Sequence, residues 1–162
     1  MVRISLILVL VVLQAVFGIP DFMTDGPYWQ RALLYSFFHG SWWHLAVNCL
    51  AIWTIFRPEH KLKPLQIVTV YLIAVLVYPL SFRPVIGFSN VLYAVLGLRT
   101  PSLKSKWWKQ PAVIIFLVVT VALVFVPQFS ATTHIAAFLL GMAGSAVKRF
   151  YQYLTRDCRR YL

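Results

Sequence analysis

Two residue types that carry out nucleophilic catalysis lie within apolar stretches of this sequence. Ser89 stands in Gly87-Phe88-Ser89-Asn90, at the start of one apolar run, and His134 opens the last such run. A serine hydroxyl becomes a good nucleophile when a base takes its proton, and an imidazole is the usual base. The sequence therefore predicts a dyad of Ser89 and His134. Taken alone, the serine also fits a helix N-cap, a position that serine favours.

A second polar group lies at the start of an earlier apolar run. His44 and Asn48 are four residues apart, so on a helix they share one face and can converge on one point. His39 precedes this run and is expected near a membrane interface, beside Trp42 and Trp43. Polar residues in apolar segments usually face a bundle interior or a cavity. Each histidine alone also fits a structural role, as a polar side chain that stabilises contacts between helices.

The acidic residues are placed too far away to orient the base. All four lie in expected loops or tails: Asp21, Asp25, Glu59 and Asp157. The predicted dyad therefore has no acidic third member. An aromatic ring can hold an imidazole by stacking, and Tyr93, one helical turn beyond Ser89, is well placed to do so.

The composition indicates an all-α membrane protein. Of the 162 residues, 60% are hydrophobic and only 12% are charged, whereas soluble domains have about 45–50% and about 25%. The net charge of +11 is spread over gaps between apolar runs, which is typical of membrane-protein loops and not of a nucleic-acid interface. The two cysteines indicate neither a disulfide framework nor a metal site. We expect a single domain over residues 1–162.

Six apolar runs predict a bundle of six transmembrane helices. They cover about residues 4–17, 42–56, 65–80, 87–98, 112–126 and 131–147. Several are shorter than the roughly 20 residues of a straight span, so flanking polar residues must enter the bilayer. The first run, with Arg3 before it and Gly18 after it, also fits a signal peptide. Residues 19–31, which follow it, are expected to form an external loop.

The basic residues predict the orientation in the membrane. Only Arg31 and Arg83 lie in the gaps assigned to one side. Thirteen lie on the other side: Arg3, Arg57, Lys61, Lys63, Arg99, Lys104, Lys106, Lys109, Lys148, Arg149, Arg156, Arg159 and Arg160. Cytoplasmic loops are enriched in lysine and arginine, so both termini are expected in the cytoplasm, with a basic tail over about residues 148–162. Chain length and this asymmetry favour the bacterial cytoplasmic membrane.

The fourth run is unusually short. Pro84 precedes it and Pro101 follows it, and both residues resist a continuous helix. About twelve residues at ~1.5 Å each give on the order of 18 Å of helix, against a hydrocarbon core of roughly 30 Å. If its end at Arg99 reaches the cytoplasmic surface, its start at Ser89 lies submerged. Unpaired N–H groups at that start would suit a developing negative charge, in a hydrated pocket that opens outward.

Small residues on the last run predict its neighbour. They recur at spacings of three and four after His134, at Ala137, Gly141, Gly144 and Ser145. Such a face lets another helix approach closely. The fourth run, which carries Gly97 eight residues after Ser89, is the expected partner.

In three blocks the chain resembles the rhomboid proteases. The first block contains His39, His44 and Asn48, after Trp29-Gln30-Arg31, which is similar to the Trp-Arg element of the family's first external loop. The second runs from Gly87 to Ala94 and is similar to the family's nucleophile motif, with its tyrosine four residues on. The third is His134 with Gly141 in the last helix. Together they span about residues 29–144.

The resemblance implies a serine protease that cleaves single-pass membrane proteins near the outer end of the transmembrane segment. It makes Ser89 the nucleophile and His134 the general base and acid, with Tyr93 packed against the imidazole. His44, Asn48 and the Ser89 N–H form the oxyanion hole, and His39 supports hydration or loop position nearby. It implies no metal and no organic cofactor. The natural substrate and the oligomeric state stay open.

Two positions depart from the family pattern. Asn90 stands where the family normally has glycine, and its side chain is expected either to crowd the oxyanion hole or to add a donor to it. Ala137 also replaces a glycine, a change of one methyl group that a slight helix shift absorbs. A non-catalytic rhomboid-like binder of transmembrane clients is thus the alternative to the protease. A small transporter with a histidine proton relay is disfavoured, because no acid and no repeated half accompany the histidines.

Overall fold

The computed structural model describes residues 2–23, 25–56, 62–81, 85–99, 114, 118 and 130–158. Within these ranges the chain is helical, and its elements follow one another in this order: α1 (Val2–Phe17), η1 (Asp21–Met23), α2 (Tyr28–Leu34), η2 (Tyr35–Phe37), α3 (Trp42–Ile55), α4 (Pro64–Val77), η4 (Tyr78–Leu80), α5 (Ser89–Arg99) and α7 (Ala131–Cys158). The η elements are short 3₁₀ helices. Five of the six predicted runs are therefore helices. The remaining run, residues 112–126, lies outside the described residues.

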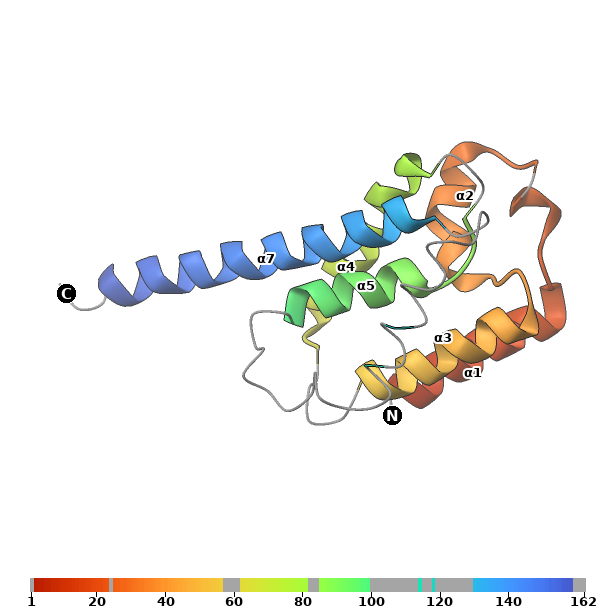
Figure 1. Ribbon diagram of the computed structural model, residues 1–162, viewed down its shortest axis with the longest axis horizontal. Helices are drawn as coiled ribbons and strands as arrows, with labels where there is room; N and C mark the ends of the chain where they lie inside the picture. Colours follow the sequence, from red (N-terminus) through yellow and green to blue (C-terminus); the bar gives the residue numbers. More distant parts are fainter. Residues whose placement is uncertain are drawn as a thin grey trace.

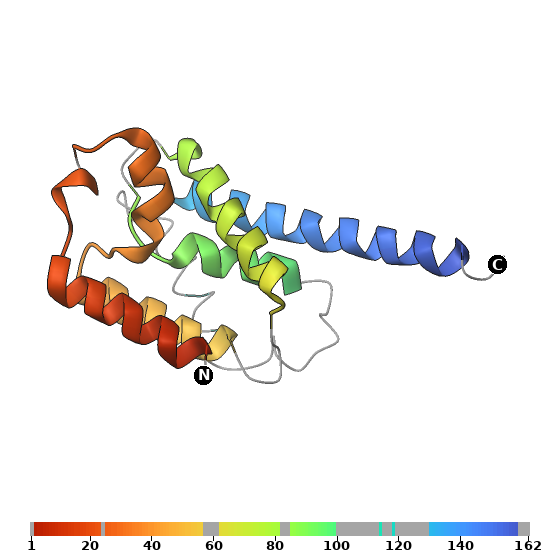
Figure 2. The same cartoon turned by 180° about the vertical axis from the view of Figure 1, so that it is seen from behind.

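The helices form a bundle around α5. In Figures 1 and 2, α5 lies against α7 on one side and α4 on another, while α1 and α3 run side by side. Each residue of α5 from Asn90 to Gly97 is buried, as expected for a central helix. Its 11 residues confirm the predicted short fourth helix, which at ~1.5 Å per residue is about 16 Å long.

Local sequence explains where the helices around the bundle begin. Ser41 precedes α3, and its hydroxyl accepts a hydrogen bond from the His44 N–H at 3.1 Å, which is typical N-cap geometry. Pro64 is the first residue of α4, where the missing N–H of proline costs nothing.

Two boundaries differ from the sequence-based prediction. The expected external loop, residues 19–31, contains η1 and the start of α2, whose residues Tyr28–Leu34 follow Pro27 and include good helix formers. The last helix is longer than the apolar run that predicted it, because α7 continues through the first part of the expected basic tail, from residue 148 to Cys158. Lysine and arginine are themselves good helix formers, so charge does not end the helix. This part of α7 extends away from the bundle in Figure 1.

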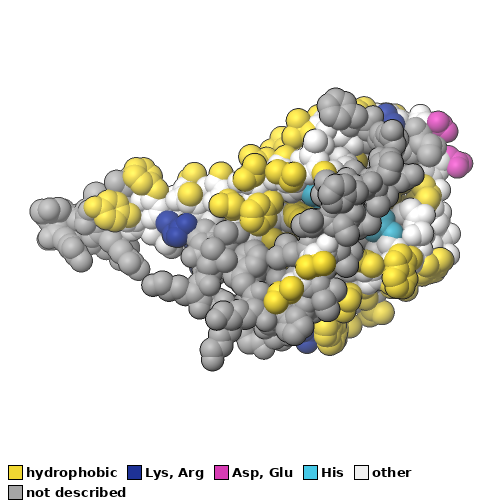
Figure 3. Space-filling model, viewed as in Figure 1, with side chains coloured by type: hydrophobic (Ala, Val, Ile, Leu, Met, Phe, Trp, Pro, Cys, Tyr) yellow, Lys and Arg dark blue, Asp and Glu magenta, His cyan; other side chains and the backbone are white. Residues whose placement is uncertain are grey.

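Apolar side chains cover much of the outer surface. Large exposed ones occur on the outer helices, among them Leu8, Trp43, Leu65 and Leu76. Figure 3 shows such side chains spread over the visible face. Among the described helices, none combines the length and the apolar character needed to cross a membrane.

Candidate active site

The bundle brings Ser89 and His134 together across the contact between α5 and α7. Ser89 is the first residue of α5, and its hydroxyl oxygen lies 2.7 Å from His134 Nε2. Ser89 is half-buried, whereas the imidazole is buried. The two residues are 45 positions apart in the chain, so their contact comes from the helix packing.

The other ring nitrogen of His134 settles which way this bond runs. His134 Nδ1 lies 2.6 Å from the backbone carbonyl oxygen of Ser130. Because a carbonyl only accepts, Nδ1 carries the proton and donates it there. In the neutral ring Nε2 is then the acceptor, so the Ser89 hydroxyl donates to it. This tautomer is the one that a general base requires.

Sequence reasoning missed the Ser130 carbonyl as an orienting group. Acidic side chains and an aromatic ring were the orienting groups considered. Because every residue has a backbone carbonyl, no residue type in the sequence marks the one that binds the imidazole. Ser130 precedes the first residue of α7, and its carbonyl also lies 3.4 Å from the His134 N–H and 3.0 Å from the Thr133 hydroxyl. The signal available was positional, since the carbonyl four residues before a histidine lies beside it at a helix start.

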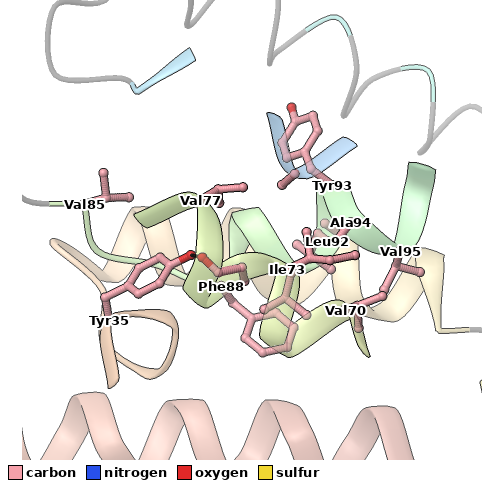
Figure 4. Packing of buried hydrophobic residues seen from close by; sticks show 14 of the residues in the cluster. Tyr35, Val70, Ile73, Val77, Val85, Phe88, Leu92, Tyr93, Ala94 and Val95 are labelled. Carbon is pink, nitrogen blue, oxygen red and sulfur yellow. Dashed lines mark hydrogen bonds between the residues drawn. The ribbon is translucent and has the colours of Figure 1, made fainter. Parts of the chain in front are cut away.

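The ring of Tyr93 lies against His134. The two ring centroids are 4.8 Å apart, and the ring planes meet at 82°, an edge-to-face contact. In Figure 4, Tyr93 points from α5 toward α7, away from the side chains of Ile73 and Val70. The imidazole is thus held by a backbone carbonyl on one edge and by an aromatic ring.

A close helix crossing sets the distance between Ser89 and His134. A Cβ on Gly97 would collide with the backbone of α7 at Phe138 and would lie 2.9 Å from the Met142 nitrogen. A Cβ on Gly141 would likewise collide with the Ala94 carbonyl of α5. The two glycines thus allow backbone to meet backbone, and this confirms the predicted pairing of the small-residue face with the fourth helix. Ala137 is fully buried.

His44 and Asn48 converge beside the segment that leads to Ser89. A Cβ on Gly87 would lie 2.8 Å from His44 Nε2 and 3.6 Å from Asn48 Nδ2. Gly87 has φ +129°, a conformation that favours glycine. Asn48 Nδ2 donates to the His44 carbonyl at 3.1 Å, which leaves the second N–H of the amide for another acceptor. Both side chains thus lie close to the backbone two residues before Ser89.

His39 lies deeper than an interfacial residue. Its side chain is fully buried, and its Nε2 lies 3.5 Å from the Phe88 N–H, one residue before Ser89. Its own backbone N–H donates to Gln14 Oε1 of α1 at 3.2 Å. His39 also meets the His44 ring edge-on, with 5.2 Å between centroids. His39 is therefore enclosed by protein, in contact with α1 and with the segment that leads to Ser89.

The Asn90 side chain is held by a contact with Tyr35. Its side chain is fully buried, and its Nδ2 donates to the hydroxyl of Tyr35 at 3.0 Å. Tyr35 lies in η2, 55 residues earlier. No local pattern in the sequence marks Tyr35, so this contact could not be predicted from it.

The rhomboid domain family matches residues 26–149. The match covers more than half of the chain and includes each of the residues that form this candidate site apart from Gln14. The chain therefore belongs to the rhomboid family, whose members are membrane proteins and generally serine intramembrane proteases. No curated protein matches the sequence.

Proposed function

We propose that this protein is an intramembrane serine endopeptidase that cleaves single-pass membrane proteins near the outer end of their transmembrane segment. The observation that carries the proposal is the pairing of the Ser89 hydroxyl with His134 Nε2 at 2.7 Å while Nδ1 donates to a carbonyl. Nucleophile and base are within hydrogen-bond reach, and a third group orients the base. Membership of the family supports the same activity.

In the proposed reaction His134 takes the proton of Ser89 as the hydroxyl oxygen attacks the scissile carbonyl. The resulting imidazolium then protonates the leaving amine, which leaves an acyl-enzyme on Ser89. Water, deprotonated by the same imidazole, hydrolyses this ester and restores the serine. The Ser130 carbonyl stabilises the imidazolium by keeping its Nδ1–H bond throughout.

The negative charge of the tetrahedral intermediate needs donors near Ser89. The Ser89 N–H lies at the start of α5, where backbone N–H groups have no helical partner. His44 Nε2 and Asn48 Nδ2 face the adjacent backbone at Gly87. We assign these three groups to the oxyanion hole, and each donor of this kind contributes about 2.7–4 kcal/mol to the transition state.

A membrane setting with both termini in the cytoplasm agrees with two contacts at one end of the bundle. Arg3 donates to the Trp53 carbonyl at 3.4 Å, and Arg99 donates to the Ile55 carbonyl. Both carbonyls lie at the carboxyl end of α3, where a helix favours positive charge. The exposed apolar surface of the outer helices suits lipid. We propose the bacterial cytoplasmic membrane as the location.

The experiment compares the intact chain with Ser89→Ala and His134→Ala on a model single-pass substrate with small residues at its outer membrane edge. We expect cleavage by the intact chain and none by Ser89→Ala. His134→Ala should lower kcat by about 10²–10⁴-fold, as loss of a general base does. Ser145→Ala removes a different serine hydroxyl, on α7, and should cleave normally. Unchanged cleavage in Ser89→Ala would refute the proposal, and so would a substrate that binds the intact chain but is never cut.

A further inference from the structure

Tyr35 binds the nucleophile segment, residues 87–90, on both sides of Ser89. Its backbone carbonyl accepts a hydrogen bond from the Gly87 N–H at 2.9 Å. Its hydroxyl accepts one from Asn90 Nδ2 at 3.0 Å. The two bonded residues are three positions apart, with Phe88 and Ser89 between them. Displacement of Ser89 relative to η2 would therefore disturb one bond or the other.

The Tyr35 hydroxyl is itself fixed in place. It donates to the Ala74 carbonyl of α4 at 2.8 Å, and the whole side chain is buried. Its ring packs against Tyr78 with 5.0 Å between centroids, and Figure 4 shows it among the buried residues near Phe88 and Val77. Because its proton is used on Ala74, the hydroxyl can only accept from Asn90. The orientation of the Asn90 amide is therefore determined.

The Asn90 side chain lowers the stability of the fold at this position. Its Oδ1 is buried and has no hydrogen-bond partner among the described residues. A buried acceptor without a partner costs stability, so the side chain is poorly explained by stability alone. Asn90 directly follows Ser89 in the first turn of α5, and its one amide bond ties that turn to Tyr35.

We propose that Tyr35 and Asn90 form a coupled pair that positions the Ser89 hydroxyl for attack. The pair joins α4, through Ala74, to η2 and to the first turn of α5. Neither side chain takes part in the chemistry, so both are positioning residues. This inference rests on the proposed protease function. It also gives Asn90 a role in supporting catalysis, instead of a departure that weakens it.

The test uses Tyr35→Phe, Asn90→Ala and the double variant of the full chain in detergent. Active sites are counted with a serine-directed fluorophosphonate probe, so that kcat is expressed per reactive serine. Misplacement of a nucleophile by about 1 Å costs on the order of 10²-fold in rate. We expect each single variant to lower kcat by about 10- to 10²-fold with KM within about two-fold. The double variant should lose no more than Tyr35→Phe alone, because both changes break one interaction.

Tyr71→Phe is the matched control. The Tyr71 hydroxyl also donates from α4 to a carbonyl of a neighbouring element, that of Leu33, and this bond does not involve residues 87–90. It should keep the kcat of the intact chain. A purely structural role for the pair predicts a lower thermal midpoint and fewer reactive serines, with kcat per reactive serine unchanged.

The outcomes separate this inference from the proposed function. If the intact chain cleaves and labels while both single variants keep its kcat per reactive serine, the pair does not position Ser89 and the protease function stands. Additive losses in the double variant would also overturn the coupling. If the intact chain neither cleaves nor labels, the protease function fails, and this inference fails with it.

Discussion

The candidate site is held together by two contacts of different kinds. The helix crossing, at Gly97 of α5 and Gly141 of α7, brings backbone against backbone and sets where Ser89 meets His134. The tether consists of hydrogen bonds that the nucleophile segment, residues 87–90, donates to Tyr35 and His39. The first contact leaves no room for side-chain atoms, whereas two of the three hydrogen bonds of the tether are made by side chains.

Because of this difference, the two contacts should respond differently to mutation. Close-packed backbone cannot move aside for an added methyl group, so side-chain atoms added at the crossing should be strongly destabilising. A hydrogen bond can lengthen or be replaced by another partner, so loss of one part of the tether should give a graded effect. Changes at the crossing should therefore affect stability and activity together, and changes at the tether mainly activity.

The largest effect is expected from Gly141→Ala. Its Cβ would meet the Ala94 carbonyl and would lie 2.9 Å from the Leu98 nitrogen, which are both backbone atoms of α5. The helices must separate, and overpacking of this kind costs about 1–3 kcal/mol of unfolding free energy. Since Ser89 and His134 lie on opposite sides of this contact, activity should fall by more than about 10²-fold. Thermal unfolding and the cleavage assay in one detergent measure both.

Gly144→Ala is the control for this change. It lies one turn further along α7, and a Cβ there would be no closer than 4.0 Å to Leu98. Replacement of glycine by alanine inside a helix stabilises by roughly 0.5–1 kcal/mol. It should therefore retain activity and unfold at a slightly higher temperature. Equal losses in both variants would show that the crossing does not control the site.

The crossing could be predicted from the sequence, while the tether could not. Small residues spaced three and four apart after His134 mark a face for close approach, and this pattern is visible in one segment. Proline on either side of the fourth run likewise indicates its shortness. Such features depend on neighbouring residues, which a single sequence displays.

The tether depends on residues that only the fold brings together. Tyr35 and Asn90 are 55 positions apart, and neither residue carries a local signal for the other. The Ser130 carbonyl was missed because each residue has such a group. The short helix α2 was missed because the acidic and turn-forming residues just before it suggested a loop. The reactive side chains of the site were therefore easier to predict from the sequence than the groups that bind and orient them.

A smaller effect is expected from Gly87→Ala, at the junction of the tether with the oxyanion donors. The residue has φ +129°, and a Cβ would lie 2.6 Å from His44 Cε1. Backbone strain of this kind costs about 1–3 kcal/mol. The shifted imidazole should lower kcat by about ten- to 10²-fold, because an oxyanion donor moves from its place.

Gly18→Ala separates strain from the site. Gly18 also has a positive φ, +59°, but no atom lies within 4 Å of its added Cβ. It should lose about 1–2 kcal/mol of unfolding free energy and keep its kcat. A loss of kcat in Gly18→Ala as large as in Gly87→Ala would mean that general destabilisation, and not the His44 contact, explains the result.

The smallest effect on activity is expected from Gln14→Leu, which removes an outer support of the tether. Gln14 Oε1 accepts the His39 N–H at 3.2 Å, and His39 in turn meets the Phe88 N–H. The variant leaves a buried N–H unpaired, at a cost of about 1–3 kcal/mol, and a small shift of His39 should lower kcat only a few-fold.

Arg3→Gln is the control on the same helix. It removes a guanidinium that lies 3.9 Å from the Trp53 ring centroid, a cation–π contact that contributes about 0.5–1 kcal/mol. If Arg3→Gln lowers kcat as much as Gln14→Leu, then α1 affects the site only through overall stability, and Gln14 does not support the tether.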